Sequence, residues 1–290
     1  MKSGRFLGLD IGGSSSRARL VEDGVVVAEA EGPGANVAVL RSDVVASRLK
    51  TLISGMGAIS PDACCAGSAG AEVPAGRERL EKLLSSMLPD SKVTVVHDAR
   101  LILAAAGLDA GIALISGTGS VAYARDRDGR EARVGGWGWL LGDDGSAAWL
   151  AREAAREVMR RLDAGEALGT LGAAMLGATR ARTTTDLVGY LHSLDEPRDW
   201  GALAGVVFQV AADDAAAAVL IERTASALSD LVSSVRKRAS ADVPLVLAGG
   251  LILNQPMLEE AVRRRVGAAT RLDEPPVAGA VKLAELSLLE

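Results

Sequence analysis

The sequence predicts an α/β protein of two lobes, because one pattern of short strands and turns occurs twice. The stretches FLGLDIGGSSSRARLVEDG and IALISGTGSVAYARDRDG read alike: each has an apolar strand, a turn of Gly, Ser or Thr, a second strand and an Asp-Gly pair. At 290 residues, the chain is long enough to bury the cores of two compact lobes. One such turn in each half is suited to holding the phosphates of a nucleotide between the lobes.

The first half begins with three strands and continues with alternating helices and strands. Residues 5–31 predict an antiparallel meander, in which Gly12-Gly13 and Asp23-Gly24 supply the tight reversals. Apolar residues at helical spacing and short apolar runs then predict helices at 42–55 and 76–88, strands at 62–67 and 92–98, and a helix from near Arg100.

The second half starts in the same way and then becomes mostly helical. Its expected elements are strands at 111–120, 121–126 and 131–138, a helix at 146–162, an Ala-rich helical region to 238, a strand at 243–250 and a helix at 277–289. The last helix is expected to pack back on the first lobe. The first lobe is therefore assigned residues 1–108 plus 277–290, and the second lobe residues 109–276.

Composition restricts the classes of partner. The 37 acidic and 32 basic residues give a net charge of -5, and 3% of the residues are aromatic, so neither a basic field nor a base-stacking surface for nucleic acid is evident. The first residues lack the apolar core of a signal peptide, and no apolar run approaches the roughly 18 residues of a membrane span. We therefore expect a cytoplasmic protein without nucleic-acid or membrane partners.

The two cysteines, Cys64 and Cys65, are adjacent on a predicted strand. Neighbouring side chains of a strand point to opposite faces, so a disulfide between them would be strained and two buried thiols are expected. With two histidines and no CxxC pair, the chain has no zinc motif.

Asp10 ends the first strand beside a turn that can bind an anion. The amides and hydroxyls of this turn can converge on phosphate, and an acid next to phosphate indicates magnesium; the turn residues are Gly12, Gly13, Ser14 and Ser15. The alternative is an ordinary hairpin. The turn is not a P-loop, because no Gly-Lys-Ser/Thr follows it, and the second half offers a matching turn in Gly117, Thr118, Gly119 and Ser120.

Asp98 follows an apolar strand and precedes a helix, which places it where the lobes are expected to meet. A carboxylate there can accept the proton of an alcohol that attacks a phosphoryl group. Asp98 can equally be the N-cap of the helix that follows. His97 alternates to the other side of the strand and is interpreted as structural.

The run from 134 to 151, VGGWGWLLGDDGSAAWLA, combines tryptophans, acids and five glycines. A Trp face and a carboxylate such as Asp143 can hold a sugar ring and its hydroxyls. The alternative places Trp137 or Trp139 in the core, with Asp144 or Ser146 capping the next helix. Weaker candidates are Asn36 and Ser68 in loops that leave the first lobe, and Gly249 and Gly250, which would let a base or ribose approach the backbone.

Together these motifs resemble the BadF/BadG/BcrA/BcrD-type ATPases of the actin, sugar kinase and Hsp70 superfamily, and within it the N-acetylglucosamine and glucosamine kinase branch. The most specific stretch is GGWGWLLGDDGS, where Asp144 replaces the common Glu. DIGGSSS resembles the first phosphate motif, with Ser14 where Thr is usual, and SGTGS resembles the second. The resemblance spans nearly the whole chain and implies a two-lobed actin-like (ribonuclease H-like) fold with a duplicated β-meander and a central cleft.

The resemblance also implies an ATP- and Mg²⁺-dependent kinase that phosphorylates the 6-hydroxyl of an amino sugar. Asp98 would be the base, Asp10 would lie near magnesium, and Gly249 and Gly250 would lie near the adenosine. The residues around the sugar would be Asn36, Ser68, Asp98, Thr118, Trp137 and Asp143. The Ala-, Gly- and Arg-rich composition suggests a high-GC bacterium and narrowly favours D-glucosamine over N-acetyl-D-glucosamine. The oligomeric state stays open, with a homodimer among the expected states.

Two other functions use the same fold. An ATP-driven activator of a CoA-dependent reductase or dehydratase would need cysteines placed to hold an iron-sulfur cluster, and adjacent cysteines on one strand argue against it. A catalytically silent sugar or nucleotide sensor stays open, although Asp10 and Asp98 are both present. Regulatory ROK-type kinases are disfavoured, because their Cys-rich zinc motif is missing.

Overall fold

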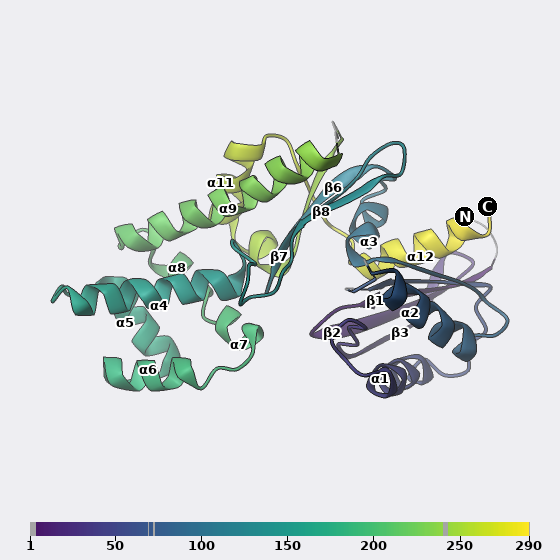
Figure 1. Cartoon of the computed structure of the whole chain (residues 1–290), viewed down its shortest axis with the longest axis horizontal. Helices are drawn as coiled ribbons and strands as arrows, with labels where there is room; N and C mark the ends of the chain where they lie inside the picture. The colour runs from purple at the N-terminus through teal and green to yellow at the C-terminus, as the bar shows by residue number, and fades with distance from the viewer. Residues whose placement is uncertain (1–3, 69, 72, 240–242, 290) are drawn as a thin grey trace. The chain divides into compact units, whose positions relative to one another are not determined.

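The computed structural model describes residues 4–68, 70–71, 73–239 and 243–289 (Figure 1). The chain divides into two compact units, Met1–Asp109 with Leu272–Glu290, and Ala110–Arg271. Each unit contains a five-stranded sheet, so the α/β fold class predicted from the sequence is confirmed. None of the helices in the described ranges is both long and apolar enough to cross a membrane.

The first sheet has the strand order β3-β2-β1-β4-β5. Its strands are β1 (Arg5–Ile11), β2 (Ser15–Glu22), β3 (Val25–Pro33), β4 (Ala63–Ser68) and β5 (Lys92–His97). The first three strands form the expected antiparallel meander, whereas β1, β4 and β5 run parallel. The carboxyl ends of these three parallel strands therefore meet at one edge of the sheet.

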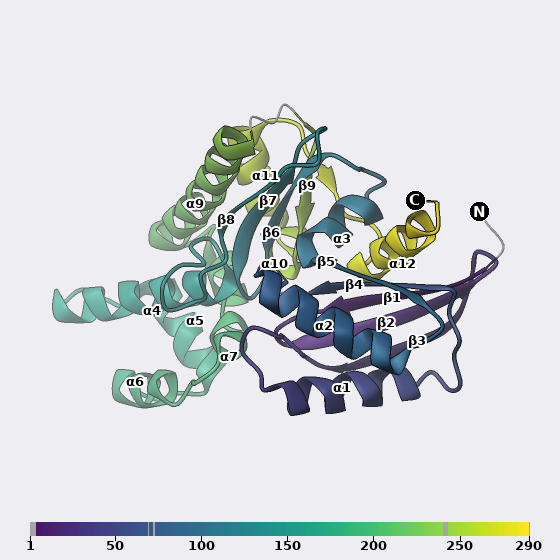
Figure 2. The same ribbon diagram turned by 45° about the vertical axis from the view of Figure 1, so that its right-hand side comes forward.

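Helices cover both faces of the first sheet (Figure 2). They are α1 (Ser42–Ser54), α2 (Pro74–Met87), α3 (Asp98–Ala105) and α12 (Pro276–Ser287). Cys64 packs in the core under α1 and α2, and Cys65 packs in the core under α3 and α12. Both thiols are buried and free, as the alternation along a strand predicts, and burial raises the pKa of each.

The last helix, α12, returns to the first unit, where it packs on β1 and α3. Glycines make this approach close: a Cβ on Gly279 would lie 1.9 Å from the carbonyl oxygen of Leu101, and one on Gly8 would lie 2.7 Å from that of Val277. Replacing either glycine would therefore push the helix away from the elements beneath it.

The second sheet repeats the order of the first. Its strands are β6 (Gly111–Ser116), β7 (Ser120–Arg125), β8 (Glu131–Gly135), β9 (Leu245–Ala248) and β10 (Thr270–Arg271). In the order β8-β7-β6-β9-β10, three antiparallel strands are again followed by parallel neighbours. The repeat seen between the two stretches of sequence is thus a repeat of sheet topology.

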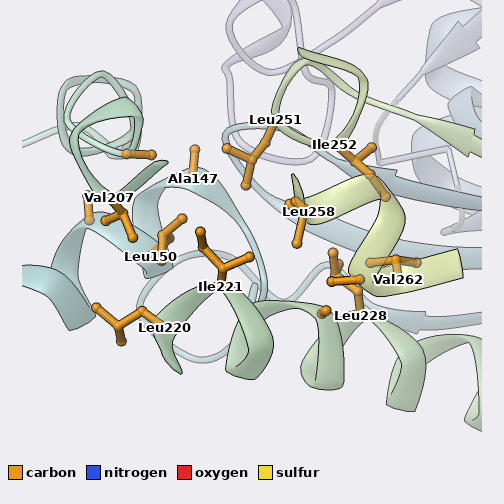
Figure 3. Packing of buried hydrophobic residues seen from close by; sticks show 14 of the residues in the cluster. Ala147, Leu150, Val207, Leu220, Ile221, Leu228, Leu251, Ile252, Leu258 and Val262 are labelled. Atoms are coloured by element: carbon orange, nitrogen blue, oxygen red, sulfur yellow. The ribbon is translucent and has the colours of Figure 1, made fainter. Parts of the chain in front are cut away.

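The second unit carries more helices than its sheet requires. They are α4 (Ala147–Asp163), α5 (Gly169–Thr179), α6 (Thr184–His192), α7 (Pro197–Gly201), α8 (Gly205–Val210), α9 (Ala215–Ala239), α10 (Gly250–Asn254) and α11 (Pro256–Val266). The long helix α9 packs on the sheet, α4 and α11. In Figure 3 its residues Leu220, Ile221 and Leu228 lie among those of α4, α8 and α11.

The structure agrees with one sequence expectation for this unit and differs from the sequence analysis at two other points. The Ala-rich region is helical as expected and comprises five helices, with new helices starting at the capping-box pair Thr183 and Asp186 and at Pro197. The strand expected at 243–250 ends at Ala248. Helices α10 and α11 were not predicted, since α10 has five residues and α11 has little apolar surface beyond Leu258, Ala261 and Val262.

A buried ion pair joins the ends of α4, α5 and α9. Asp214 receives two hydrogen bonds from Arg161, at 2.8 and 3.0 Å, and a third from the Leu171 amide at 3.0 Å. These contacts hold the pKa of Asp214 well below its usual value, with the Arg161 hydrogen bonds as the largest cause. The carboxylate is buried, so the pair is shielded from solvent.

We expect Asp214→Asn to lower the free energy of unfolding by about 3 kcal/mol, because it removes the buried carboxylate that accepts two hydrogen bonds from Arg161 and leaves that guanidinium with Glu157 as its counter-charge. A depressed carboxyl pKa stabilises the fold above the unfolded value of 3.8, and this contribution disappears as the pH falls through the lower folded value. Urea unfolding should therefore show a smaller difference between wild type and variant at pH 3 than at pH 7. Asp213→Asn, at the exposed neighbouring position, should change stability little.

Candidate functional site

In the first unit, the parallel strands bring three predicted site residues to one edge. Ile11 is in register with Ser68, and Ser68 is in register with His97. Asp10, Ser68 and Asp98 therefore lie at the carboxyl ends of adjacent strands, although they are far apart in sequence. This edge is where α/β sheets bind ligands.

Asp10 and Asp98 interact electrostatically. The pKa of Asp10 is raised to about 6. Burial is the largest cause, and the negative charge of Asp98 adds to it, whereas the positive charge of Arg17 on the neighbouring strand lowers the pKa. Two carboxylates in one neighbourhood favour a cation between or beside them. Their oxygen donors fit Mg²⁺, which commonly takes one or two carboxylates and completes its shell with phosphate and water. The described residues contain no cluster of three or more metal-ligating side chains, so such an ion would need those further donors.

Asp98 is the first residue of α3, and the cap of that helix is His97 rather than Asp98. His97 is buried, and its Nδ1 accepts a hydrogen bond from the Ala99 amide at 3.1 Å. Oδ1 of Asp98 lies 2.9 Å from the same Nδ1 and 2.8 Å from the Ala99 nitrogen. The structural interpretation of His97 is thus confirmed, and the N-cap alternative for Asp98 is wrong. The side chain of Asp98 is 30% exposed, so part of its carboxylate is accessible to solvent.

The first glycine turn holds the loop that carries Asn36. The Gly34 amide donates to the Ser14 carbonyl at 3.1 Å, and the Ala35 amide donates to the Gly12 carbonyl at 3.2 Å. A Cβ on Gly34 would lie 2.0 Å from the Gly13 carbonyl oxygen, so this contact requires glycine. Asn36 is thereby held close to the turn in the first unit.

Arginines from α1 and α2 fix the same loop. Arg48 donates to the carbonyl of Gly34, and Arg79 donates to the carbonyl of Val37. Oδ1 of Asn36 accepts a hydrogen bond from the Ala38 amide at 2.8 Å. This contact orients the side chain and leaves its NH₂ group as the donor for a ligand.

In the second unit, the turn between β6 and β7 is tied to the loop before α4. The Gly117 amide donates to Gly119 at 2.9 Å, and the Ala147 amide donates to Gly117 at 2.8 Å. The hydroxyl of Ser120 donates to the carbonyl of Asp144 at 2.7 Å. These hydrogen bonds join the second turn, residues 117–120, to the loop before α4, which contains Trp137 and Asp143.

Asp143, in the loop before α4, has a left-handed backbone conformation and a closely packed side chain. Its backbone has a φ of +58°, and a Cβ on Gly119 would lie 2.7 Å from its Oδ2. Burial is the main cause of its raised pKa, against backbone donors from Gly138 and Ser120. Its Oδ1 is buried and has no hydrogen-bond partner among the described residues. An unpartnered buried acceptor is costly, and a ligand hydroxyl would satisfy it.

Trp137 is 67% exposed, so its placement in the core is wrong. The guanidinium of Arg133 lies 5.1 Å from the centre of its ring, and Arg133 also donates to the Gly136 carbonyl. Trp139 is half-buried, and its carbonyl accepts a hydrogen bond from Arg152 at 2.8 Å. Ser146 caps α4, as one of the sequence alternatives proposed.

Gly249 and Gly250 lie against the second turn, within the same unit. Gly249 has a φ of +97°, and a Cβ there would lie 2.5 Å from the Ser116 carbonyl oxygen. A Cβ on Gly117 would lie 3.6 Å from the nitrogen of Gly250. The two glycines therefore form a side-chain-free surface beside the turn.

If these glycines lie near the adenosine, as the resemblance implies, Gly249→Ala should raise the KM for ATP by at least tenfold, because the new methyl group must displace the backbone of Ser116. Gly267→Ala is the matched control: Gly267 has a φ of +85°, but nothing lies within 4 Å of its Cβ position. Both variants carry similar backbone strain, so an equal change in KM would show that the close approach is irrelevant to ATP binding. Initial rates at varied ATP would measure the difference.

Sequence reasoning missed the residues that position these groups. Gly34 permits a close approach to the backbone of Gly13. Arg79 donates to the carbonyl of Val37, and Arg133 lies over the ring of Trp137. No local pattern distinguishes them from other glycines and arginines. The glycines of the GPGAN stretch indicated a special backbone conformation at Gly34, but Gly13, which Gly34 contacts, lies 21 residues earlier in the sequence.

The sequence of the chain matches one protein family over almost the entire length of the chain. The match to the BadF/BadG/BcrA/BcrD ATPase family covers residues 7–281. The chain belongs to this family. The resemblance seen in its motifs is thereby confirmed.

Two curated family relatives are similar to part of the chain. An N-acetylmuramic acid/N-acetylglucosamine kinase from Clostridium acetobutylicum is 29% identical over 195 residues, which cover 64% of this chain and 63% of the relative. An N-acetyl-D-glucosamine kinase from Dictyostelium discoideum is 25% identical over 214 residues, 70% of this chain and 66% of the relative. The chain thus spans just under two thirds of the length of each.

A solved structure from Chromobacterium violaceum, provisionally assigned as an N-acetylglucosamine kinase, has the same fold. Its TM-score is 0.78 at 24% identity, and the alignment covers 97% of this chain and 99% of that one. This likeness concerns the fold of the family. It supports the actin-like architecture that the sequence motifs imply.

Proposed function

We propose that the protein is a kinase that transfers the γ-phosphate of ATP to the 6-hydroxyl of an amino sugar. Its ATPase family and the names of its two curated relatives support this activity. The observation that carries the proposal is the pair Asp10 and Asp98 at one sheet edge, where the Asp98 side chain is partly exposed. This edge offers one carboxylate for a metal and another for a proton.

The proposed reaction assigns one task to each group. Oδ2 of Asp98 accepts the proton of the sugar hydroxyl while its oxygen bonds to the γ-phosphorus and the bond to the ADP oxygen breaks. Asp10 would hold Mg²⁺, which neutralises charge on the phosphates. The amides at Gly12–Ser15 and Gly117–Ser120 would bind those phosphates, and Gly249 and Gly250 would admit the adenosine.

Each unit carries part of the proposed set of sugar-binding residues. In this proposal, Asn36 donates a hydrogen bond through its amide, Oδ1 of Asp143 accepts a hydroxyl, and the exposed ring of Trp137 packs on apolar C–H groups. Ser68 and Thr118 are the other residues assigned to the sugar in this proposal. The names of the relatives favour an N-acetylated substrate, whereas composition narrowly favours D-glucosamine, so both are retained in the proposal.

The deciding experiment is Mg²⁺-dependent ADP release measured separately with D-glucosamine, N-acetyl-D-glucosamine, N-acetylmuramic acid and glucose. We expect turnover with an amino sugar and much less with glucose. The phosphorylated product should carry its phosphate on the 6-oxygen by NMR. ADP release that is independent of sugar would overturn the proposal in favour of a partner-coupled ATPase, and sugar binding without turnover would favour a sensor.

A further inference from the structure

A separate pocket in the second unit is lined by residues of α4, α6 and α7. These three helices are labelled in Figures 1 and 2. Its volume of about 460 Å³ is within the range of small-molecule sites. The lining is mainly apolar and includes Ala155, Met159, Leu191 and Trp200. None of the residues assigned above to phosphate, metal or sugar lines it, so the proposed reaction gives it no role.

One cation in the lining lacks a counter-charge. Arg152 forms no ion pair with any described residue, and its Nε is buried without a hydrogen-bond partner. The other arginines of the lining differ: Arg156 pairs with Glu153 at 2.7 Å, and Arg160 pairs with Glu157 at 2.8 Å. The pocket also includes the carboxylate of Asp163, which is exposed to solvent.

We propose that this pocket binds a small organic anion with an apolar or aromatic body. A half-buried guanidinium in apolar surroundings is unfavourable without a partner, and a carboxylate, sulfonate or phosphate would supply both charge and a hydrogen-bond acceptor for Nε. Trp200, Met159 and Leu191 would cover the apolar body. An uncharged ligand would leave Arg152 uncompensated, so the negative charge is the defining feature.

The same arginine connects the pocket to the loop that carries Trp137 and Asp143. Nη1 of Arg152 donates to the carbonyl of Trp139 at 2.8 Å. An anion that reorients the guanidinium would alter this contact and thereby the loop. Occupancy of the pocket should therefore change the KM for the sugar. This second step depends on the proposed kinase function, whereas binding of the anion does not.

Binding can be tested with a fluorescent pair that differs in charge. Anilinonaphthalene sulfonate carries an anionic group on an aromatic body, and phenylnaphthylamine has the same body without the charge. We expect the sulfonate to bind at least tenfold more tightly, since a hydrogen bond to a charged group makes a contribution of this size. Saturating ATP and amino sugar should not compete with it for the pocket, although the proposed coupling requires the sugar to change its affinity by a similar, few-fold factor.

Substitutions test whether the sulfonate binds in this pocket and whether the loss of any one positive charge would weaken its binding equally. Arg152→Met should remove most of the preference for the sulfonate, whereas Arg264→Met, at an exposed paired position on α11, should preserve it. Met159→Trp should fill the pocket and weaken both probes, which gives a test independent of Arg152. Absence of sulfonate binding, equal binding of both probes, or binding insensitive to these two pocket substitutions would overturn the site.

The effect of pocket occupancy on the sugar KM is measured separately. With wild-type protein, the sulfonate should change the sugar KM at least twofold at saturating probe, while kcat changes less. An unchanged KM with confirmed binding would overturn the coupling and leave the site. Absence of sugar turnover in the unliganded protein would instead contradict the proposed kinase function, and the binding result would still stand.

Discussion

Asp98→Asn is expected to lower kcat by about 10²- to 10⁴-fold, the range for loss of a general base. The amide cannot accept the hydroxyl proton, although it has nearly the same shape as the carboxylate. His97 caps α3 through its own side chain, so the helix should persist in the variant. The sugar should bind with an affinity within several-fold of wild type. Steady-state rates and calorimetric sugar binding would separate the two effects.

The control for this substitution is Asp90→Asn, which removes an exposed carboxylate from the same unit. It should leave kcat unchanged. An Asp98→Asn protein with wild-type turnover would remove Asp98 from the mechanism. Loss of sugar binding together with turnover would instead give Asp98 a role in holding the sugar rather than in accepting its proton.

The strand repeat was predictable because it is encoded locally, in apolar runs that end at glycine turns. The opposite burial of Cys64 and Cys65 was predictable for the same reason, since alternation along a strand determines it. These inferences need only neighbouring residues. They predicted the antiparallel meander that begins each sheet, whereas the parallel pairing of the later strands became evident only from the structure.

Other features depend on contacts between distant segments. His97 displaced Asp98 as the cap of α3, because the helix starts one residue earlier than a capping Asp requires and the imidazole reaches the Ala99 amide. The exposure of Trp137 reflects a loop tied to the second turn through Ser120 and Asp144. Neither outcome follows from residue type or spacing.

The position of Asn36 shows why the candidate site was only partly predictable. Its motif is short, and its placement comes from Gly34 packing on Gly13 and from Arg48 and Arg79 on two helices. A sequence comparison within a family can mark such a residue. The reason for its position appears only when the loop, the turn and both helices are seen together.

Asp10→Asn is expected to stabilise the fold at neutral pH while it reduces activity. The folded-state pKa of Asp10 is about 6, against 3.8 for an ordinary Asp, so the folded protein favours the protonated carboxyl. Its stabilising contribution is therefore complete below pH 3.8 and is lost as the pH rises through 6. The difference corresponds to about 3 kcal/mol. Asparagine resembles the protonated form and would avoid this loss.

Urea unfolding in the presence of a chelator would test the effect on stability. The variant should gain up to about 3 kcal/mol over wild type at pH 7.5, and the gain should shrink toward pH 4.5 as Asp10 becomes protonated. Asp98→Asn should reproduce part of the gain, because it removes a negative charge that raises the pKa of Asp10. A variant less stable than wild type at pH 7.5 would show that the buried carboxylate is well compensated in the folded protein.

The same substitution should cost activity, because the charge that destabilises the fold is the charge proposed to hold magnesium. We expect kcat to fall by about 10²- to 10³-fold, comparable to the loss of a major electrostatic contribution to the transition state. In wild type at limiting Mg²⁺, activity should fall below about pH 6 as Asp10 takes up a proton, and saturating Mg²⁺ should move that fall to lower pH. A more stable but nearly inactive variant would show that Asp10 is retained for function at the expense of stability.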